Sequence, residues 1–321
     1  MEHRADVGAQ VDLLVEYGSR RFVVEYKGSG SAAVVGSAIA QVKQYAAAIG
    51  RSTIPIIAVP FMGDVGKSLC KDANVWWFDL SGNAHIVAPG LRILIEGKPN
   101  RFVRRGRPST AFAPKSARVA RHLLLDPKRV VRQQDLARET GLDDGFTSRI
   151  VRRLVSDGLV DRDARGALRV RDPNLLLDAW LETYDFEKHA ILRGHVTARS
   201  GEELVAKLAE GFTRASLRHA ATGLAAAWLW TGFASFRLAS MFVAAQPDEA
   251  LLREVGFREQ PKGANAWLVL PNDEGVFDGA VEAQGIACVH PVQAYVDLGA
   301  HPERAKEAAD ELRTRQLKWG R

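Results

Sequence analysis

The stretch VDLLVEYGSRRFVVEYK, from Val11 to Lys27, decides how the N-terminal part of the chain folds. Two runs rich in β-branched and aromatic residues flank a polar turn, so the stretch predicts two short paired strands. This pair carries Asp12 near its start and Glu25 and Lys27 at its end. Charged side chains form strands poorly and are costly to bury. Their presence therefore indicates either a solvated face or a cluster that binds a partner.

Side-chain alternation along a strand places Glu25 and Lys27 on one face and Tyr26 on the other. If the first strand pairs antiparallel with the second, Asp12 lies opposite this face. Two carboxylates beside a lysine suit phosphodiester cleavage. A divalent cation would hold the scissile phosphate and activate water, and magnesium prefers carboxylate oxygens. The lysine would neutralise charge or help to position the water.

These residues resemble the PD-(D/E)xK nuclease superfamily, with Asp12, a spacer of twelve residues, and then Glu25-Tyr26-Lys27. The following segment QVKQY adds Gln41 and Tyr45, one helical turn apart, which looks like the QxxxY element of RecB-type members. The resemblance covers residues 10–96 and implies a restriction-endonuclease-like core with Mg²⁺ or Mn²⁺ as cofactor. The implied catalytic residues are Asp12, Glu25, Lys27, Gln41 and Tyr45, with Asp12 and Glu25 as metal ligands.

The remaining pattern of the N-terminal part predicts a mixed α/β domain over residues 1–97. Beyond the strand pair we expect a helix over 31–49, a strand over 53–61, a helix over 64–74, a strand over 75–80 and a hairpin over 85–97. Only nine residues precede Gln10, where the nuclease family usually has a further helix. That helix is therefore expected to be missing or to lie before the start of this sequence. The polar residues Asp79, Ser81 and Asn83 are expected to be ordinary turn formers.

The positive charge of the chain is concentrated in its middle. The net charge is +6 over 321 residues, but residues 101–171 hold 18 Lys and Arg against 8 Asp and Glu, a balance of +10. A basic patch confined to one segment favours a polyanionic partner, and nucleic acid is the leading candidate. The alternative is a solvated arginine-rich segment.

The basic middle predicts a linker over residues 98–115 and a winged helix-turn-helix over 116–172. Three helical patterns, beginning near Ser116, Arg132 and Asp143, precede a β-hairpin, which is the winged-helix arrangement. The third helix would bury Phe146, Ile150, Leu154 and Val155 and present its other sides to DNA. The predicted DNA-binding residues are Thr147, Ser148, Arg149, Arg152 and Arg153 on this helix and Arg162, Arg165 and Arg169 in the wing.

Residues 173–321 are less basic and predict a C-terminal α+β domain. An alanine-rich helix is expected over 216–230, strands near 240–246 and 266–273, and a last helix over 301–318. Residues 116–321 loosely resemble AbiEi-type antitoxins of type IV toxin–antitoxin systems, which implies a nucleotidyltransferase-like C-terminal domain. Thr222-Gly223 stands where an active transferase has Gly-Ser, and no DxD follows, so we expect no transferase activity. Asp273, Glu274 and Asp278 are expected to be solvated.

Two functions follow from these predictions. The first is a double-stranded DNA-binding protein with a magnesium-dependent endonuclease site. The alternative is a transcriptional repressor or antitoxin whose nuclease-like domain is not catalytic, and RNA cleavage is a weaker third possibility. A toxin protein and a second copy of the chain are possible partners. The lone Cys70 and Cys288, the lack of a long apolar run and the lack of a leader pattern favour a cytoplasmic protein without zinc, an organic cofactor or a membrane segment.

Overall fold

A computed structural model describes residues 11–18, 20–50, 52–102, 111–233, 235–260, 262–302 and 304–319. The chain forms two compact units. The first unit holds residues 1–109 and 154–161, and the second holds residues 110–153 and 162–321.

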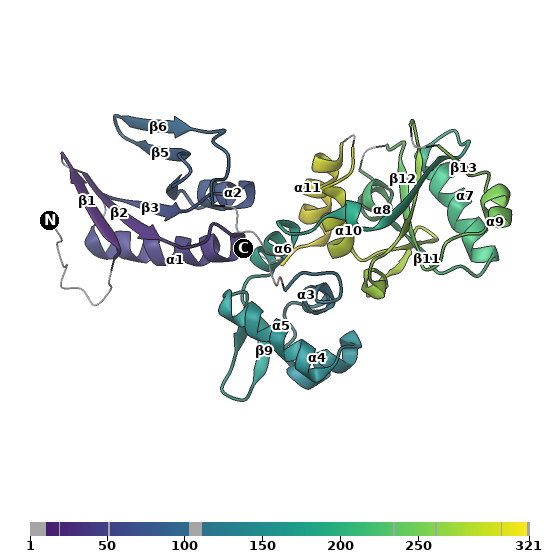
Figure 1. The fold of residues 1–321 in the computed structure, drawn as a ribbon, viewed down its shortest axis with the longest axis horizontal. Coiled ribbons are helices and arrows are strands. Elements are labelled where there is room, and N and C mark those ends of the chain that lie inside the picture. Colours follow the sequence, from purple (N-terminus) through teal and green to yellow (C-terminus); the bar gives the residue numbers. More distant parts are fainter. Residues whose placement is uncertain are drawn as a thin grey trace. The chain divides into compact units, whose positions relative to one another are not determined.

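The first unit is built on a six-stranded mixed sheet whose spatial order follows the chain (Figure 1). Its strands are β1 (Leu13–Tyr17), β2 (Arg20–Tyr26), β3 (Thr53–Val59), β4 (Trp76–Asp79), β5 (Ala84–Ala88) and β6 (Leu91–Ile95). Strands β2, β3 and β4 run parallel, while the other neighbouring pairs are antiparallel. Parallel strands need crossover connections, and these are α1 (Ala32–Ile49) and α2 (Asp64–Asp72).

Among the described residues, α1 and α2 cover one face of this sheet and no helix covers the other. On the covered face, Val23 and Ile57 pack against Val35 and Val42 of α1 and Cys70 of α2. A run of small and β-branched residues gives α1 this apolar side, and Ser31 precedes it as the N-terminal flanking residue. A second, smaller cluster of buried residues lies on the opposite face, where Ile86 and Leu91 pack against Phe22, Val24 and Ile56.

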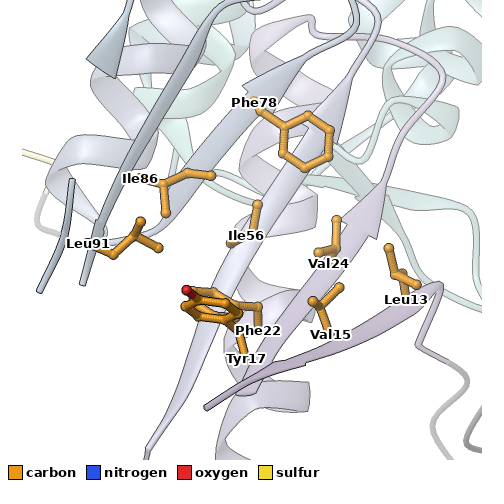
Figure 2. A pocket seen from close by; sticks show the side chains of 9 residues that line it. All are labelled: Leu13, Val15, Tyr17, Phe22, Val24, Ile56, Phe78, Ile86 and Leu91. Atoms are coloured by element: carbon orange, nitrogen blue, oxygen red, sulfur yellow. The ribbon is translucent and has the colours of Figure 1, made fainter. Parts of the chain in front are cut away.

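The opposite face of the sheet forms an apolar groove with a volume of about 450 Å³. Figure 2 shows Leu13 and Val15 of β1 on one side of this groove and Ile86 and Leu91 of the β5–β6 hairpin on the other, with Tyr17 beside Phe22 between them. Leu13 is 52% exposed and Tyr17 is 69% exposed. Because β1 is also an edge strand, this face combines exposed apolar side chains with an unpaired backbone edge.

Residues 111–170 form helices and a small sheet in winged-helix order, and all of them except residues 154–161 belong to the second unit. The elements are α3 (Ala117–Leu125), β7 (Val131–Arg132), α4 (Gln133–Thr140), α5 (Asp144–Ser156), β8 (Val160–Arg162) and β9 (Ala167–Val170). The three strands form a sheet in the order β7-β9-β8. Asp143 caps the start of α5, because its Oδ1 accepts a hydrogen bond from the Phe146 N–H at 2.7 Å. The left-handed Gly158 (φ 71°) follows the end of α5.

The rest of the second unit contains a seven-stranded mixed sheet flanked by helices. The strand order is β13-β10-β14-β12-β11-β16-β15. The strands are β10 (Ala190–His195), β11 (His219–Thr222), β12 (Ala239–Val243), β13 (Arg258–Glu259), β14 (Ala266–Leu270), β15 (Val281–Ala283) and β16 (Ile286–Cys288). The helices are α6 (Pro173–Leu181), α7 (Gly201–Arg214), α8 (Gly223–Thr231), α9 (Glu249–Glu254), α10 (Pro291–Leu298) and α11 (Ala305–Gln316), with short 3₁₀ turns η1 (Phe186–Lys188) and η2 (Glu274–Phe277).

One expected helix of this region is wrong in its first half. The alanine-rich stretch over 216–230 predicts a single helix, but its first part forms β11 and only the second part forms α8. Strand β11 pairs with β12 and β16 in the middle of the sheet, and Ala220 and Ala221 are fully buried. Pairing with strands distant in sequence overrides the helical preference of alanine here.

Candidate functional site

The strand pair of the first unit brings Asp12 to the end of β2. Leu13 pairs with Val24 in the β1–β2 register, and Asp12 Oδ2 accepts a hydrogen bond from the Tyr26 N–H at 2.8 Å. Asp12 is therefore adjacent to the segment that carries Glu25 and Lys27. The antiparallel pairing assumed from the sequence is the one that the structure shows.

Glu25 and Lys27 lie on the same face of β2, as side-chain alternation requires. Lys27 Nζ contacts Glu25 Oε1 at 2.6 Å and donates to Gln41 Oε1 at 2.9 Å. Gln41 Nε2 in turn donates to the Tyr45 hydroxyl at 2.8 Å. Four of the five residues predicted from the sequence are thus joined by side-chain hydrogen bonds between the end of β2 and the middle of α1, and Asp12 lies opposite Glu25 with its carboxylate on the Tyr26 N–H. Their proposed roles stay predictions.

The burial and hydrogen bonding of Glu25 indicate whether this cluster can hold a cation. Its side chain is buried, with 3% of the residue exposed, and Oε2 has no hydrogen-bond partner among the described residues. A buried carboxylate oxygen without a partner is energetically costly. A divalent cation shared with Asp12 would satisfy it, so the donor set fits a magnesium ion held by two carboxylates and water.

No cluster of three or more His, Cys, Asp and Glu side chains suited to a metal ion occurs in the described ranges. A cation here would therefore have at most the two carboxylates of Asp12 and Glu25 as protein ligands. Magnesium is usually bound in this manner, with one or two carboxylates and the remaining ligands from water and phosphate. Zinc sites need three or four protein ligands.

The turn after β4 contains three buried polar side chains. Asp79, Ser81 and Asn83 are each less than 10% exposed, although the sequence predicts ordinary turn formers. Both Asp79 oxygens accept hydrogen bonds from Asn83, at 2.9 Å from its backbone N–H and 2.9 Å from its side-chain amide. These residues form the turn between β4 and β5, as expected, and the structure adds that their polar groups are buried together and hydrogen-bonded to one another.

Helix α5 presents three arginines on its exposed side, which makes it the candidate nucleic-acid interface. Arg149, Arg152 and Arg153 are exposed and Ser148 is half-buried. The Arg149 guanidinium also lies over the Phe146 ring, with 5.6 Å from Cζ to the ring centroid. Cations on one side of a helix are suited to phosphates and to base edges in a major groove.

The prediction that Thr147 faces DNA is wrong. Thr147 is fully buried, and its hydroxyl has no hydrogen-bond partner among the described residues. The buried side of α5 consists of Thr147, Ile150, Val151 and Leu154, while Phe146 and Val155 are half-buried. The helical repeat of 3.6 residues explains the shift, because positions 147, 150, 151 and 154 share one stripe.

The wing presents Arg162, Arg165 and Arg169, all of which are exposed. Arg162 Nη2 donates to Gln133 Oε1 of α4 at 2.5 Å, which connects the wing to the second helix. Asp163 Oδ1 accepts hydrogen bonds from the Arg165 N–H at 2.8 Å and the Ala167 N–H at 2.9 Å, and so shapes the turn. The wing is therefore an ordered loop that exposes three cations, one of which is held by Gln133.

Sequence reasoning missed the residues that join the winged helix to the C-terminal sheet. Arg118 of α3 binds Asp273 through two hydrogen bonds, of 2.7 Å from Nε and 2.9 Å from Nη2. Arg121, which is 2% exposed, donates to Gln293 Oε1 of α10 from Nε at 2.9 Å and from Nη2 at 2.8 Å. The expectation that Asp273 is solvated is wrong, because its side chain is 9% exposed in this ion pair. Glu274, at 74% exposed, is solvated as expected.

A buried polar network continues from Arg121 into the C-terminal sheet. Asp297 of α10 is fully buried and accepts hydrogen bonds from Tyr184, Thr222 and Gln293. Burial raises the pKa of Asp297 to about 7, although the three hydrogen bonds oppose the shift. The pKa of the Asp297 carboxyl in this network is thus moved close to neutral pH.

The N-terminus of α8 is filled by a side chain. A Cβ placed on Gly223 would lie 2.2 Å from His301 Nε2, and the φ of Gly223 is +58°. His301 is held there by Ser240 Oγ at 2.8 Å and by the Asp297 carbonyl at 2.8 Å. A nucleotide phosphate would approach this turn from the side that His301 occupies. The absence of transferase activity stays a prediction that this packing supports.

Comparison with known proteins identifies one region of the chain. Residues 113–169 match the family model described as the MarR family. The match runs from just before α3 into β9 and so covers the three helices and the wing. No curated protein and no solved structure shows significant similarity to the chain. No helix of the described ranges is long and apolar enough to cross a membrane. The structure is thus a mixed α/β protein that contains a MarR-like winged-helix region.

Proposed function

We propose that the protein is a double-stranded DNA-binding transcriptional regulator that acts as a repressor. The observation that carries this proposal is the MarR-like winged helix at residues 113–169 with a cationic exposed side on α5. Arg149, Arg152 and Arg153 would contact the major groove, and the wing arginines would contact the backbone. A homodimer on a two-fold symmetric site is the assembly that this class of module favours.

The experiment is duplex binding by the full chain before and after replacement of two arginines. We expect the Arg149→Ala/Arg152→Ala variant to bind sites selected from a random-sequence library at least tenfold more weakly, because each lost base or phosphate contact costs about 1–3 kcal/mol. Arg253→Ala, an exposed arginine of α9, is the matched control. Equal affinity of the double variant and wild type would refute the proposal. A reporter carrying the selected site then tests repression.

A second candidate function is magnesium-dependent phosphodiester cleavage at the cluster of the first unit. It is favoured by the buried, unpartnered Oε2 of Glu25 next to Asp12 and Lys27. Asp12 and Glu25 would hold Mg²⁺ or Mn²⁺, which would supply charge stabilisation and an acidified water. Lys27, held between Glu25 and Gln41, would place its ammonium beside the phosphate.

Metal binding separates this candidate from a purely regulatory protein. We expect Mn²⁺, measured by electron paramagnetic resonance, to bind wild type and to bind Glu25→Gln at least tenfold more weakly. The matched control is Glu16→Gln, an exposed carboxylate on the same hairpin. Nicking of supercoiled DNA by wild type, lost in Glu25→Gln and Lys27→Ala, would establish cleavage. Failure of wild type to bind Mn²⁺ would eliminate the candidate and leave the regulator. The toxin partner stays a prediction from the antitoxin resemblance.

A further inference from the structure

The three parallel strands of the first unit end at the same edge of the sheet, and this edge holds more than the carboxylate cluster. In the register of β2, β3 and β4, Tyr26 lies beside Ala58 and Ala58 beside Phe78. One residue further on, Lys27 is therefore level with Asp79, two strands away. Strands lie about 5 Å apart, so about 10 Å separates the end of β2 from the end of β4.

Side chains of the buried turn after β4 hydrogen-bond to the backbone of residues 98 and 101, which follow the last strand of this domain. Asn83 Nδ2 donates to the Lys98 carbonyl at 3.0 Å, and Asn83 Oδ1 accepts from the Lys98 N–H at 2.8 Å. Ser81 Oγ accepts from the Arg101 N–H at 3.2 Å and donates to the Pro60 carbonyl at 3.2 Å. Asn83 is itself fixed by the Asp79 carboxylate. A set of buried polar side chains thus fastens the backbone of residues 98–101 to the edge.

The fastened segment exposes two cations. Lys98 and Arg101 are both exposed, and neither side chain has an ion-pair or hydrogen-bond partner among the described residues. The Lys98 stem runs over Gly82, with Cγ 3.7 Å from the position that a Cβ on Gly82 would take. Because their backbone is already ordered, these side chains would lose less conformational entropy on binding an anion than cations on a free loop would.

We propose that Lys98 and Arg101 form a second contact with the phosphate backbone of duplex DNA, on the first unit and distinct from the winged helix. The edge that presents them also presents Asp12, Glu25 and Lys27, whose chemistry suits a phosphodiester. The chain then continues into the segment that matches the MarR family. The inference rests on the proposed DNA-binding function and extends it to a second surface. Such contacts are sequence-independent and strongly salt-dependent.

The test is the salt dependence of binding to a labelled random-sequence duplex by the full chain. The Arg149→Ala/Arg152→Ala variant serves as the background, so that the winged helix contributes less. Adding Lys98→Ala and Arg101→Ala is expected to weaken binding at low salt at least tenfold. The slope of log K against log salt should become shallower by about 1.8, because each lost phosphate contact contributes about 0.9.

The matched control removes two other exposed cations of the same unit, Lys71→Ala and Arg92→Ala. Lys71 lies in the last turn of α2, near the start of β4 rather than its end, and Arg92 lies in β6 away from the β4 turn. Thermal unfolding confirms that each variant is folded. An equal change of slope in both pairs, or no change in either, would overturn the proposal. Because both pairs are compared in one background, this result is read independently of whether Arg149 and Arg152 bind DNA.

Discussion

Asp297 shows how one buried residue sets the pH response of the C-terminal region. Its carboxyl is enclosed by Tyr184, Thr222 and Gln293, and burial raises its pKa to about 7. In the unfolded chain an aspartate titrates near pH 4. Between about pH 4 and pH 7 the folded state therefore binds more protons than the unfolded state. The stability that Asp297 contributes is full below about pH 4 and is lost as the pH rises through 7.

We expect this linkage to appear as a difference between wild type and Asp297→Asn, which cannot ionise. The free energy of unfolding of wild type, relative to the variant, should fall between pH 4 and pH 7 and become constant above pH 7. Urea unfolding at several pH values measures it. His189 and His301, whose pKa values burial lowers to about 4, also change the stability in this pH range, but they are present in both proteins and their contribution cancels in the difference. A pH-independent difference would contradict the raised pKa.

At the scale of the element, the start of α8 depends on a glycine for two separate reasons. Gly223 has a left-handed backbone, and the space beside its Cα is filled by His301. Gly232, at the other end of the same helix, has a similar φ of +65° but nothing within 4 Å of a Cβ. The two glycines form a natural pair of variants that separates backbone strain from steric overlap.

We expect Gly232→Ala to lower the free energy of unfolding by about 1 kcal/mol, the cost of a left-handed residue with a Cβ. Gly223→Ala should lower it by about 3 kcal/mol, because the added methyl must also displace His301 from its two hydrogen bonds. Chemical denaturation of the two variants measures both values. If both substitutions lower the free energy of unfolding equally, His301 moves away from the added methyl group without losing stability.

At the scale of the whole molecule, the second unit is held together by arginines of α3. Arg118 binds Asp273 bidentately and Arg121 is buried against Gln293, so the winged helix is attached to the C-terminal sheet rather than carried on a free linker. The proposed DNA-binding helix α5 would therefore be oriented by the C-terminal region. This attachment gives that region a structural role that needs no chemistry of its own.

We expect Arg118→Ala to lower the free energy of unfolding of the second unit by about 2 kcal/mol, since it leaves the largely buried Asp273 without its charged partner. The control is Arg138→Ala, which breaks the exposed pair with Asp135 and should cost about 0.5 kcal/mol or less. Differential scanning calorimetry checks both and shows whether the winged helix then unfolds in a separate transition. Equal effects of the two substitutions would show that the α3 contact does not stabilise the unit.

The sequence by itself determined the features whose signals are local. The strand pair around Asp12, Glu25 and Lys27 and the helix that carries Gln41 and Tyr45 follow from alternation and helical spacing over short windows. The three helices and wing follow in the same manner, and Asp143 at the start of α5 was readable from helix capping. The carboxylate–lysine cluster could be predicted because its members are joined by a hairpin and one helical turn.

Only the tertiary structure decided the features that depend on contacts between distant segments. Central pairing made residues 219–222 a strand, and packing of the helix bundle buried Thr147 on the side expected to face DNA. The ion pair of Arg118 with Asp273 joins residues 155 positions apart. No local sequence pattern indicates the hydrogen bonds of Asn83 to the Lys98 backbone either. Burial of a polar residue depends on which surfaces meet, and no local period encodes that.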